Sequence, residues 1–226
     1  MSKNASIKAV AFDLDGTILD TLPDLTNAMN LALKAHGREG HSLEVYGRLV
    51  GRGNLALTRS ALPPEVPDGE AVREVYERFL VEYEKCQTER SAPYPGIIDL
   101  MKTLKERGLP LAVISNKNHP NVATILKHYF PGLIDHVRGV TADRPPKPDP
   151  TGGRELLKTL GLAPADVCFV GDSVLDMRYG KTVMGFRPVV GVSWGYCPRG
   201  ELEKEGPDLI LDKPSDFLPL LDGTRT

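Results

Sequence analysis

Four short apolar segments, each followed by small or polar residues, constrain the fold of this chain most strongly. Apart from Lys8 and Gly191, their residues are apolar and do not alternate with polar ones, which is typical of parallel strands buried on both faces of a sheet. Stretches with apolar residues at helical spacing lie between them. Strands alternating with helices predict an α/β fold with a parallel sheet and right-handed crossovers. The predicted strands are Ile7 to Phe12, Leu111 to Ile114, Val167 to Val170 and Val189 to Val192, with a shorter fifth at Leu209 to Leu211.

Residues 21–93 depart from this alternation. Two apolar stripes at helical spacing, Leu22 to Leu33 and Val72 to Tyr83, are separated by proline-rich breaks, and no convincing strand lies between them. We therefore expect an all-helical domain over residues 21–93, inserted into an α/β core formed by residues 1–20 and 94–226. A length of 226 residues suits one core with such an insertion.

Composition excludes several partners. Lys and Arg total 28 and Asp and Glu total 30, so the net charge of −2 gives no case for nucleic acid or an anionic membrane. No segment approaches the ~20 consecutive apolar residues of a membrane helix. The three cysteines form no CxxC pair and are expected to be reduced thiols in a cytoplasmic protein. Composition is compatible with either a monomer or a homodimer.

Two carboxylates follow the first predicted strand, in the segment Asp13-Leu14-Asp15-Gly16-Thr17. Ligands of open α/β sheets bind at the carboxyl ends of the strands, and residues two apart on an extended chain point the same way. Two carboxylates held close together raise each other's cost of ionisation unless a cation neutralises them. Because Asp and Gly are also common in turns, this segment alone is compatible with a turn or with a functional site.

Three further segments carry polar groups at the ends of predicted strands or in the loops beyond them. Ser115 and Asn116 offer a hydroxyl and an amide, and Lys147 lies between two prolines on a stiff segment. Asp172 and Asp176 form a second acidic pair, which favours a hard cation such as Mg²⁺. Taken singly, these segments are equally compatible with turns, a helix cap or a solvated lysine.

Together, the four segments supply the groups that phosphoryl transfer requires. A cation and donors stabilise the charged phosphoryl group while one carboxylate attacks it. The set, in this order from Asp13 to Asp176, resembles the haloacid dehalogenase superfamily of aspartate-nucleophile phosphatases. More narrowly, it resembles the phosphoglycolate phosphatase-like branch. The resemblance implies a Rossmann-like three-layer core with a mobile helical cap that closes over the substrate.

The resemblance also implies roles for individual residues. Asp13 would be the nucleophile that forms an aspartyl-phosphate, and Asp15 the general acid that protonates the leaving oxygen and later activates water. Lys147 would bridge the phosphoryl group and the nucleophile. The residues expected to hold the phosphoryl oxygens are Thr17, Ser115 and Asn116. Those expected to hold Mg²⁺ are Asp13, Asp172 and the backbone carbonyl of Asp15, with Asp176 acting through water or by orienting the others.

Substrate choice is expected in the helical block. The segment Gly51-Arg52-Gly53 resembles the cap specificity loop of phosphoglycolate phosphatases, and Arg52 would bind a second anionic group on the substrate. The best single substrate is therefore 2-phosphoglycolate. The presence of Asp15 also favours an ester or anhydride substrate, because an alkoxide leaving group needs a proton.

Other functions remain open at this stage. A sugar phosphomutase of the β-phosphoglucomutase type uses the same aspartyl-phosphate, and pyrophosphate or nucleotide hydrolysis uses the same core chemistry. A catalytically silent phosphate-binding protein is the non-enzyme alternative. The chain also departs from the family pattern after Asp176, where Gly180 to Gly185 contains one extra residue, so the register of that helix is open.

Overall fold

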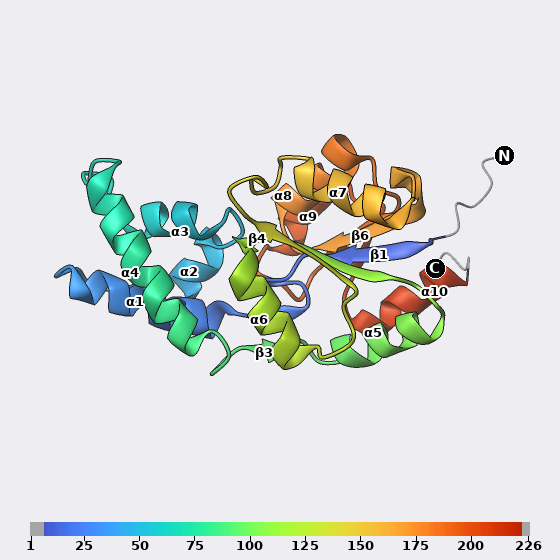
Figure 1. Ribbon diagram of the computed structural model, residues 1–226, viewed down its shortest axis with the longest axis horizontal. Helices are drawn as coiled ribbons and strands as arrows, with labels where there is room; N and C mark the ends of the chain where they lie inside the picture. Colours follow the sequence, from blue (N-terminus) through green and yellow to red (C-terminus); the bar gives the residue numbers. More distant parts are fainter. Residues whose placement is uncertain (1–6, 223–226) are drawn as a thin grey trace.

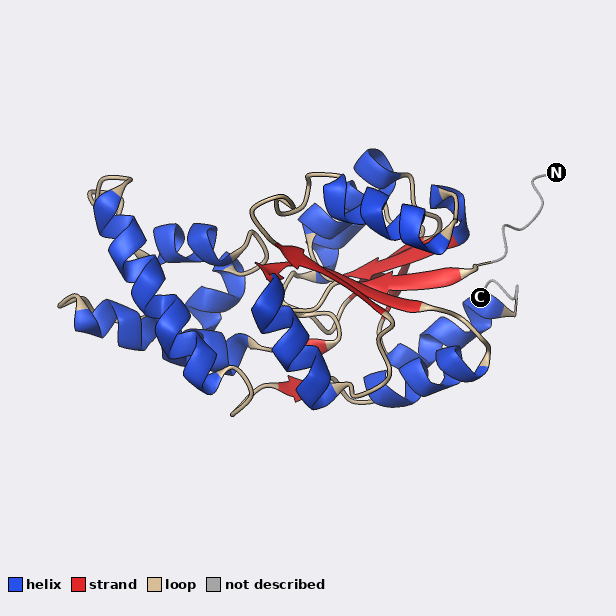
Figure 2. Ribbon diagram, viewed as in Figure 1, coloured by secondary structure: helices blue, strands red, loops and turns tan. Residues whose placement is uncertain are grey.

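The computed structural model describes residues 7–222, and a six-stranded parallel sheet lies at its centre (Figures 1 and 2). The strand order is β5-β4-β1-β6-β7-β8, and all neighbouring strands run parallel. The predicted parallel α/β fold is confirmed. The strands are β1 (Ala9–Phe12), β4 (Leu111–Asn118), β5 (His136–Val140), β6 (Val167–Gly171), β7 (Val189–Val192) and β8 (Leu209–Leu211).

The central strand β1 is apolar on both faces because helices cover both faces of the sheet. Val10 and Phe12 pack into one hydrophobic cluster, and Ala9 and Ala11 pack into the other. This alternation follows from the two-residue period of a strand. Since β1 lies between β4 and β6, the chain that leaves it at Asp13 emerges between the ends of the two neighbouring strands.

The helices of the core lie in two layers, one on each face of the sheet (Figure 1). The lower layer in this view contains α5 (Ile97–Glu106), α6 (His119–Tyr129) and α10 (Leu218–Leu221). The upper layer contains α7 (Thr151–Leu160), α8 (Val174–Arg178) and α9 (Arg199–Lys204). Short 3₁₀ turns complete the core at η1 (Pro164–Asp166) and η3 (Pro214–Phe217).

Strand β5 was not predicted from the sequence. Only Gly139 in this strand is buried, and its other residues are half-buried because β5 lies at the edge of the sheet. An edge strand does not need the continuous apolar run that identified the central strands. Its pairing with β4 is interrupted between Ile114 and Asn118. Irregularities of this kind re-aim side chains, and this one includes the predicted site residues Ser115 and Asn116.

A π-helical segment, η2 (Tyr179–Met184), accommodates the extra residue that left the register open. A π-turn contains more residues than an α-turn and lets a helix absorb an insertion. Tyr179 and Met184 remain buried in the hydrophobic cluster that includes Ala9 and Ala11 of β1. Gly180 is required at the contact with β7, because a Cβ at this position would lie 2.8 Å from a methyl carbon of Val189.

Four helices form a group beside the sheet, at the left of Figure 1. They are α1 (Leu22–Ala35), α2 (Leu43–Leu49), α3 (Asn54–Ala61) and α4 (Glu70–Cys86). The predicted apolar stripes of α1 and α4 face inward and share one hydrophobic cluster. Within residues 7–222, no helix has the length and apolarity needed to cross a membrane.

The chain enters and leaves this helical group through a two-stranded antiparallel ribbon of β2 (Leu19–Asp20) and β3 (Ala92–Pro93). The short strand β3 lies within residues 21–93, where no strand was expected. Next to the ribbon, the fully buried carboxylate of Asp24 connects the segment that enters the helical group with the segment that leaves it. It accepts hydrogen bonds from the backbone N–H groups of Arg90 and Ser91, at 3.0 and 2.9 Å, and from the Ser91 hydroxyl at 2.6 Å.

We expect Asp24→Ala to lower the free energy of unfolding by about 3 kcal/mol, because buried donors that lose a charged acceptor carry a large desolvation cost. Denaturant unfolding followed by circular dichroism measures the change. The exposed residue Asp143 provides the matched control, and Asp143→Ala should change the stability by less than about 0.5 kcal/mol. Equal effects of the two substitutions would contradict this role for Asp24.

Candidate active site

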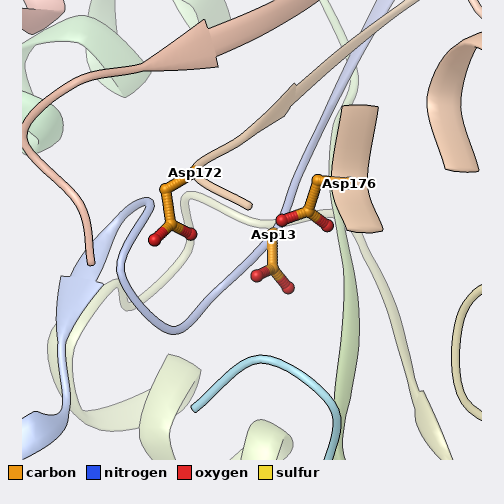
Figure 3. A group of neighbouring side chains, drawn as sticks. All are labelled: Asp13, Asp172 and Asp176. Atoms are coloured by element: carbon orange, nitrogen blue, oxygen red, sulfur yellow. The ribbon is translucent and has the colours of Figure 1, made fainter. Parts of the chain in front are cut away.

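Three carboxylates converge at the carboxyl ends of β1 and β6 (Figure 3). Asp13 follows β1, and Asp172 and Asp176 follow β6. These two strands are neighbours, with Phe12 opposite Val170. One oxygen from each carboxylate lies within 4.8 Å of the others, and all three side chains are buried. The two predicted acidic pairs thus contribute three of their four members to one cluster.

Lys147 lies inside this cluster. Its Nζ is 2.8 Å from Oδ1 of Asp13 and 2.7 Å from Oδ1 of Asp176. Burial alone would lower the pKa of Lys147, but the charges of Asp13 and Asp176 outweigh it and raise the pKa above that of a free lysine. The ammonium is therefore charged at every physiological pH and bridges the two carboxylates.

Asn116 holds the backbone of Lys147 in place. Its Oδ1 accepts the Lys147 N–H at 2.6 Å, and its Nδ2 donates to the Lys147 carbonyl at 3.2 Å. Nδ2 also donates to the carbonyl of Gly51, in the loop before α3, at 3.1 Å. The side chain of Asn116 is thus engaged in positioning Lys147 and the helical group. Ser115 is buried, and its Oγ accepts the N–H of Lys117 at 3.2 Å.

Asp172 has no lysine or arginine partner in the described part of the chain. Its Oδ1 accepts a hydrogen bond from the Thr17 hydroxyl at 2.9 Å, and its Oδ2 accepts the N–H of Tyr196 at 2.9 Å. Gly16 lies against this carboxylate, where a Cβ would be 2.3 Å from Oδ2, and its φ of +82° also favours glycine. Thr17 therefore contacts Asp172 with the hydroxyl that the sequence assigned to the phosphoryl group.

Burial perturbs the acidic cluster. Desolvation raises the pKa of Asp13 to about 7, although Lys147 opposes the shift and Asp176 adds to it. Desolvation also raises the pKa of Asp172 well above its usual range, and the charge of Asp176 contributes. Buried carboxylate oxygens carrying more negative charge than one lysine neutralises are a suitable donor set for a hard divalent cation. The residues present therefore fit the metal that the motifs predict.

The side chain of Asp15 points away from this cluster. Its Oδ1 is 2.9 Å from Nζ of Lys117 and accepts a hydrogen bond from the Thr21 hydroxyl at 2.5 Å. Lys117, which is 2% exposed, was not predicted from the sequence as a site residue. Only its place directly after Ser115 and Asn116 could have drawn attention to it, because a lone lysine is usually solvated. Burial lowers the pKa of Lys117, but Asp15 and Tyr83 together outweigh burial and raise the pKa above that of a free lysine.

Tyr196 connects the cluster to the helical group. Its hydroxyl accepts N–H groups of Thr21 and Leu22 at 2.8 and 3.1 Å, at the beginning of α1. The N–H groups of a first helical turn have no partner within the helix, so Tyr196 supplies an acceptor for them, and the Leu22 N–H also donates to Oδ1 of Asp20 at 3.2 Å. The same hydroxyl lies 3.0 Å from Oδ1 of Asp20. Tyr196 thereby connects Asp172 with residues 20–22, where the chain passes from the sheet into the helical group.

Two cavities meet at the loop before α3. The inner cavity, of about 20 Å³, is lined by Asp13, Ser115 and Lys117. The outer cavity, of about 880 Å³, is lined by Arg52 together with Lys147 and Asp172. Arg52 is exposed. The structure therefore brings all the predicted site residues to one end of the sheet, with Arg52 at the outer side of the loop.

The raised pKa values predict how a cation and protons compete. A carboxyl group with a folded-state pKa of about 7, against about 4 when unfolded, binds its proton more tightly in the folded protein. The free energy of unfolding of the metal-free protein should therefore fall as the pH rises from about 4 to about 7. Thermal unfolding with and without Mg²⁺ should show greater stabilisation by the cation at pH 8 than at pH 6.

The control for this experiment is Asp172→Asn, which should reduce the stabilisation by Mg²⁺ at both pH values. A matched substitution of the exposed Asp99, Asp99→Asn, should leave the stabilisation unchanged. Stabilisation by Mg²⁺ that is equal at pH 6 and pH 8 would contradict the assignment of the cation to this cluster.

Comparison with known proteins identifies the family. A family model described as haloacid dehalogenase-like hydrolase matches residues 7–183. The chain is 33% identical over 223 residues to phosphoglycolate phosphatase 1 of Pseudomonas aeruginosa, which covers 95% of this chain and 80% of the relative. It is 32% identical over 247 residues to the phosphoglycolate phosphatase of Escherichia coli O157:H7, which covers 98% and 95%.

A solved structure shares both the fold and part of the sequence. A predicted phosphoglycolate phosphatase from Haemophilus somnus 129pt superposes with a TM-score of 0.87 at 29% identity, covering 95% of this chain and 97% of that one. The resemblance inferred from the motifs is confirmed, and the chain belongs to the haloacid dehalogenase-like hydrolase family of enzymes.

Proposed function

We propose that this protein is a Mg²⁺-dependent phosphatase that hydrolyses a small phosphorylated metabolite, 2-phosphoglycolate, through an aspartyl-phosphate. The observation that carries the proposal is the Asp13 carboxylate, buried beside Lys147 and lining the inner cavity. A carboxylate held beside a buried lysine at a strand end can serve as the nucleophile toward phosphorus. Relatives named phosphoglycolate phosphatase support the choice of substrate.

The reaction proceeds in two balanced steps. A carboxylate oxygen of Asp13 forms a bond to phosphorus as the ester P–O bond breaks, and Asp15 donates its proton to the departing oxygen. Asp15 then takes a proton from water, the water oxygen attacks the phosphorus of the aspartyl-phosphate, and phosphate leaves as the Asp13 carboxylate is restored. The position of Asp15 outside the acidic cluster, at the cavity side of the site, supports this division of roles.

Mg²⁺ would be held by Asp13, Asp172 and the backbone carbonyl of Asp15, with Asp176 acting through water or by orienting the others. The cation supplies neutralisation of charge on the transferring phosphoryl group. Lys147 supplies a second, permanent positive charge next to the nucleophile. In this arrangement the protein places both positive charges before the substrate arrives, so little reorganisation accompanies the reaction.

Three further residues serve the phosphoryl group in different ways. Ser115 has a buried hydroxyl at the inner cavity and donates to a phosphoryl oxygen. Thr17 and Asn116 lie beside the same site. The Thr17 hydroxyl orients Asp172, and the Asn116 amide orients Lys147. These contacts distinguish a hydroxyl available to the substrate from polar groups that fix the charged side chains.

Residues 21–93 act as the cap of this enzyme, and residues 1–20 and 94–226 form its core, of which 1–6 and 223–226 lie outside the described structure. The hydrogen bond from Asn116 to the Gly51 carbonyl closes the loop before α3 onto the core. Closure of a cap excludes bulk water from a charged reaction. Arg52 lies at the outer cavity, where it attracts the second anionic group of an incoming substrate. The enzyme acts in the cytoplasm as a monomer or homodimer.

We expect Asp13→Asn to abolish phosphate release while the protein remains folded, because the amide cannot form the aspartyl-phosphate. Release of phosphate in Mg²⁺ should be measured on 2-phosphoglycolate, pyrophosphate, nucleoside monophosphates and β-glucose 1-phosphate, with and without chelator.

The wild-type protein and an Asp99→Asn control should release phosphate from 2-phosphoglycolate at the highest rate. Conversion of β-glucose 1-phosphate to glucose 6-phosphate without phosphate release would instead identify a mutase.

Arg52→Ala should raise KM for 2-phosphoglycolate about fivefold and leave kcat nearly unchanged, because an exposed arginine acts on the approach of the anion. The effect should shrink at high ionic strength, which screens exposed charges. Arg154→Ala, which removes an exposed arginine of α7, is the control. A fall in kcat that persists in high salt would contradict the attraction role and assign Arg52 to the reaction itself.

A further inference from the structure

The inner cavity is lined by polar groups besides the carboxylates of Asp13 and Asp15. Lys117 contributes from the core, and Gly53 and Asn54 contribute from the loop that begins α3. Apolar side chains of Leu25, Val50 and Leu57 also line this cavity. A few polar donors set among apolar side chains are typical of a site that orients a small ligand.

Asn54 brings an unpaired donor to this cavity. It is 7% exposed, and its Nδ2 is buried without a hydrogen-bond partner among the described residues. Leaving a buried amide donor unpaired costs free energy that an acceptor on a ligand would recover. The cavity wall therefore carries a donor that no group within residues 7–222 satisfies.

Helix α3 begins at the same point. Its N-cap is Gly53, which has no side chain to accept the N–H groups of the first turn. The residue has a φ of +93°, and a Cβ would lie 3.3 Å from the Asn116 carbonyl, so the close approach of this loop to the core favours glycine. An uncapped first turn carries a partial positive charge and attracts anions.

Lys117 adds a full positive charge. Its Nζ pairs with Asp15 at 2.9 Å and lies 4.7 Å from the centre of the Tyr83 ring of α4. An ammonium has three N–H donors, and Asp15 is the one carboxylate paired with it among the described residues. The cavity thus offers an ammonium, an amide N–H₂ and a helix N-terminus, all of which favour an anion.

We propose that Lys117, Asn54 and the first turn of α3 form a subsite that binds the carboxylate of a short phosphorylated acid while its phosphoryl group lies at Asp13. This inference rests on the proposed function, because it names the part of the same site that selects the substrate. At about 20 Å³, space for about one water-sized group, the cavity favours a small group such as a carboxylate over a sugar ring. The subsite therefore selects a two-carbon acid over a sugar phosphate.

The test compares two substrates that differ in this one group. 2-Phosphoglycolate carries a carboxylate where ethyl phosphate carries a methyl group, so the ratio of their kcat/KM values measures the contribution of the subsite. In the wild-type protein we expect a ratio of about 100 or more. Lys117→Met, which keeps the length of the side chain, should reduce the ratio about 100-fold, and Asn54→Ala should reduce it about tenfold.

A control variant and a measurement of stability separate the subsite from other roles. Lys102→Met, in which an exposed lysine of α5 is replaced, should leave the ratio unchanged. Lys117 also contacts Asp15, so Lys117→Met can slow both substrates, but only loss of the subsite lowers their ratio. If thermal unfolding shows that Lys117→Met is destabilised, the Asn54→Ala variant tests the subsite instead. Because Asn54 Nδ2 has no hydrogen-bond partner among the described residues, removing it leaves no acceptor unpaired.

The outcomes distinguish this inference from the proposed function. A wild-type protein that hydrolyses both substrates equally well overturns the subsite and leaves the phosphatase standing. Equal losses on both substrates in Lys117→Met and Asn54→Ala overturn the subsite as well. A wild-type protein that releases phosphate from neither substrate overturns the proposed function itself.

Discussion

The structure depends on a buried ammonium shared by two buried carboxylates. Lys147 lies between Asp13 and Asp176, three groups that come from different parts of the chain. Removing such charges from water is costly, and their mutual attraction repays that cost only when the geometry is good. The strand order brings Asp13 and Asp176 together. The two prolines beside Lys147 and the hydrogen bonds from Asn116 to the Lys147 backbone hold the ammonium between them. The cluster is a suitable site for a divalent cation, because Asp172 has no basic partner among residues 7–222.

The same polar groups that build the site also attach the helical group to the core. Tyr196 joins Asp172 to the first turn of α1, and Asn116 joins Lys147 to the Gly51 carbonyl. Lys117 lies between Asp15 and the ring of Tyr83 in α4. Movement of the helices would therefore alter the surroundings of the charged residues directly. The contacts that hold the helical group against the sheet are therefore also contacts of the charged cluster.

Local patterns predicted most of the fold and the residues of the acidic cluster. Continuous apolar runs identified the buried strands because both faces of a central strand are covered. The edge strand β5 was missed because half-buried residues leave no such run. The π-helical segment η2 could not be anticipated, since the sequence showed one extra residue but not how a helix would absorb it. Lys117 was missed because a single lysine has no pattern that separates a buried one from a solvated one.

The sequence by itself determined the chemistry. Residues such as Asp13 and Asp172 follow apolar strands, and the carboxyl ends of parallel strands meet at one edge of a sheet. Tertiary structure alone decided which side chains contact one another: the Thr17 hydroxyl donates to Asp172, and Asp15 pairs with Lys117. It also decided that Asn54 lines a cavity and that its Nδ2 has no hydrogen-bond partner among the described residues. The physical reason is that strand order and helix docking set distances between segments far apart in the chain, and neither leaves a local signature in the residues they bring together.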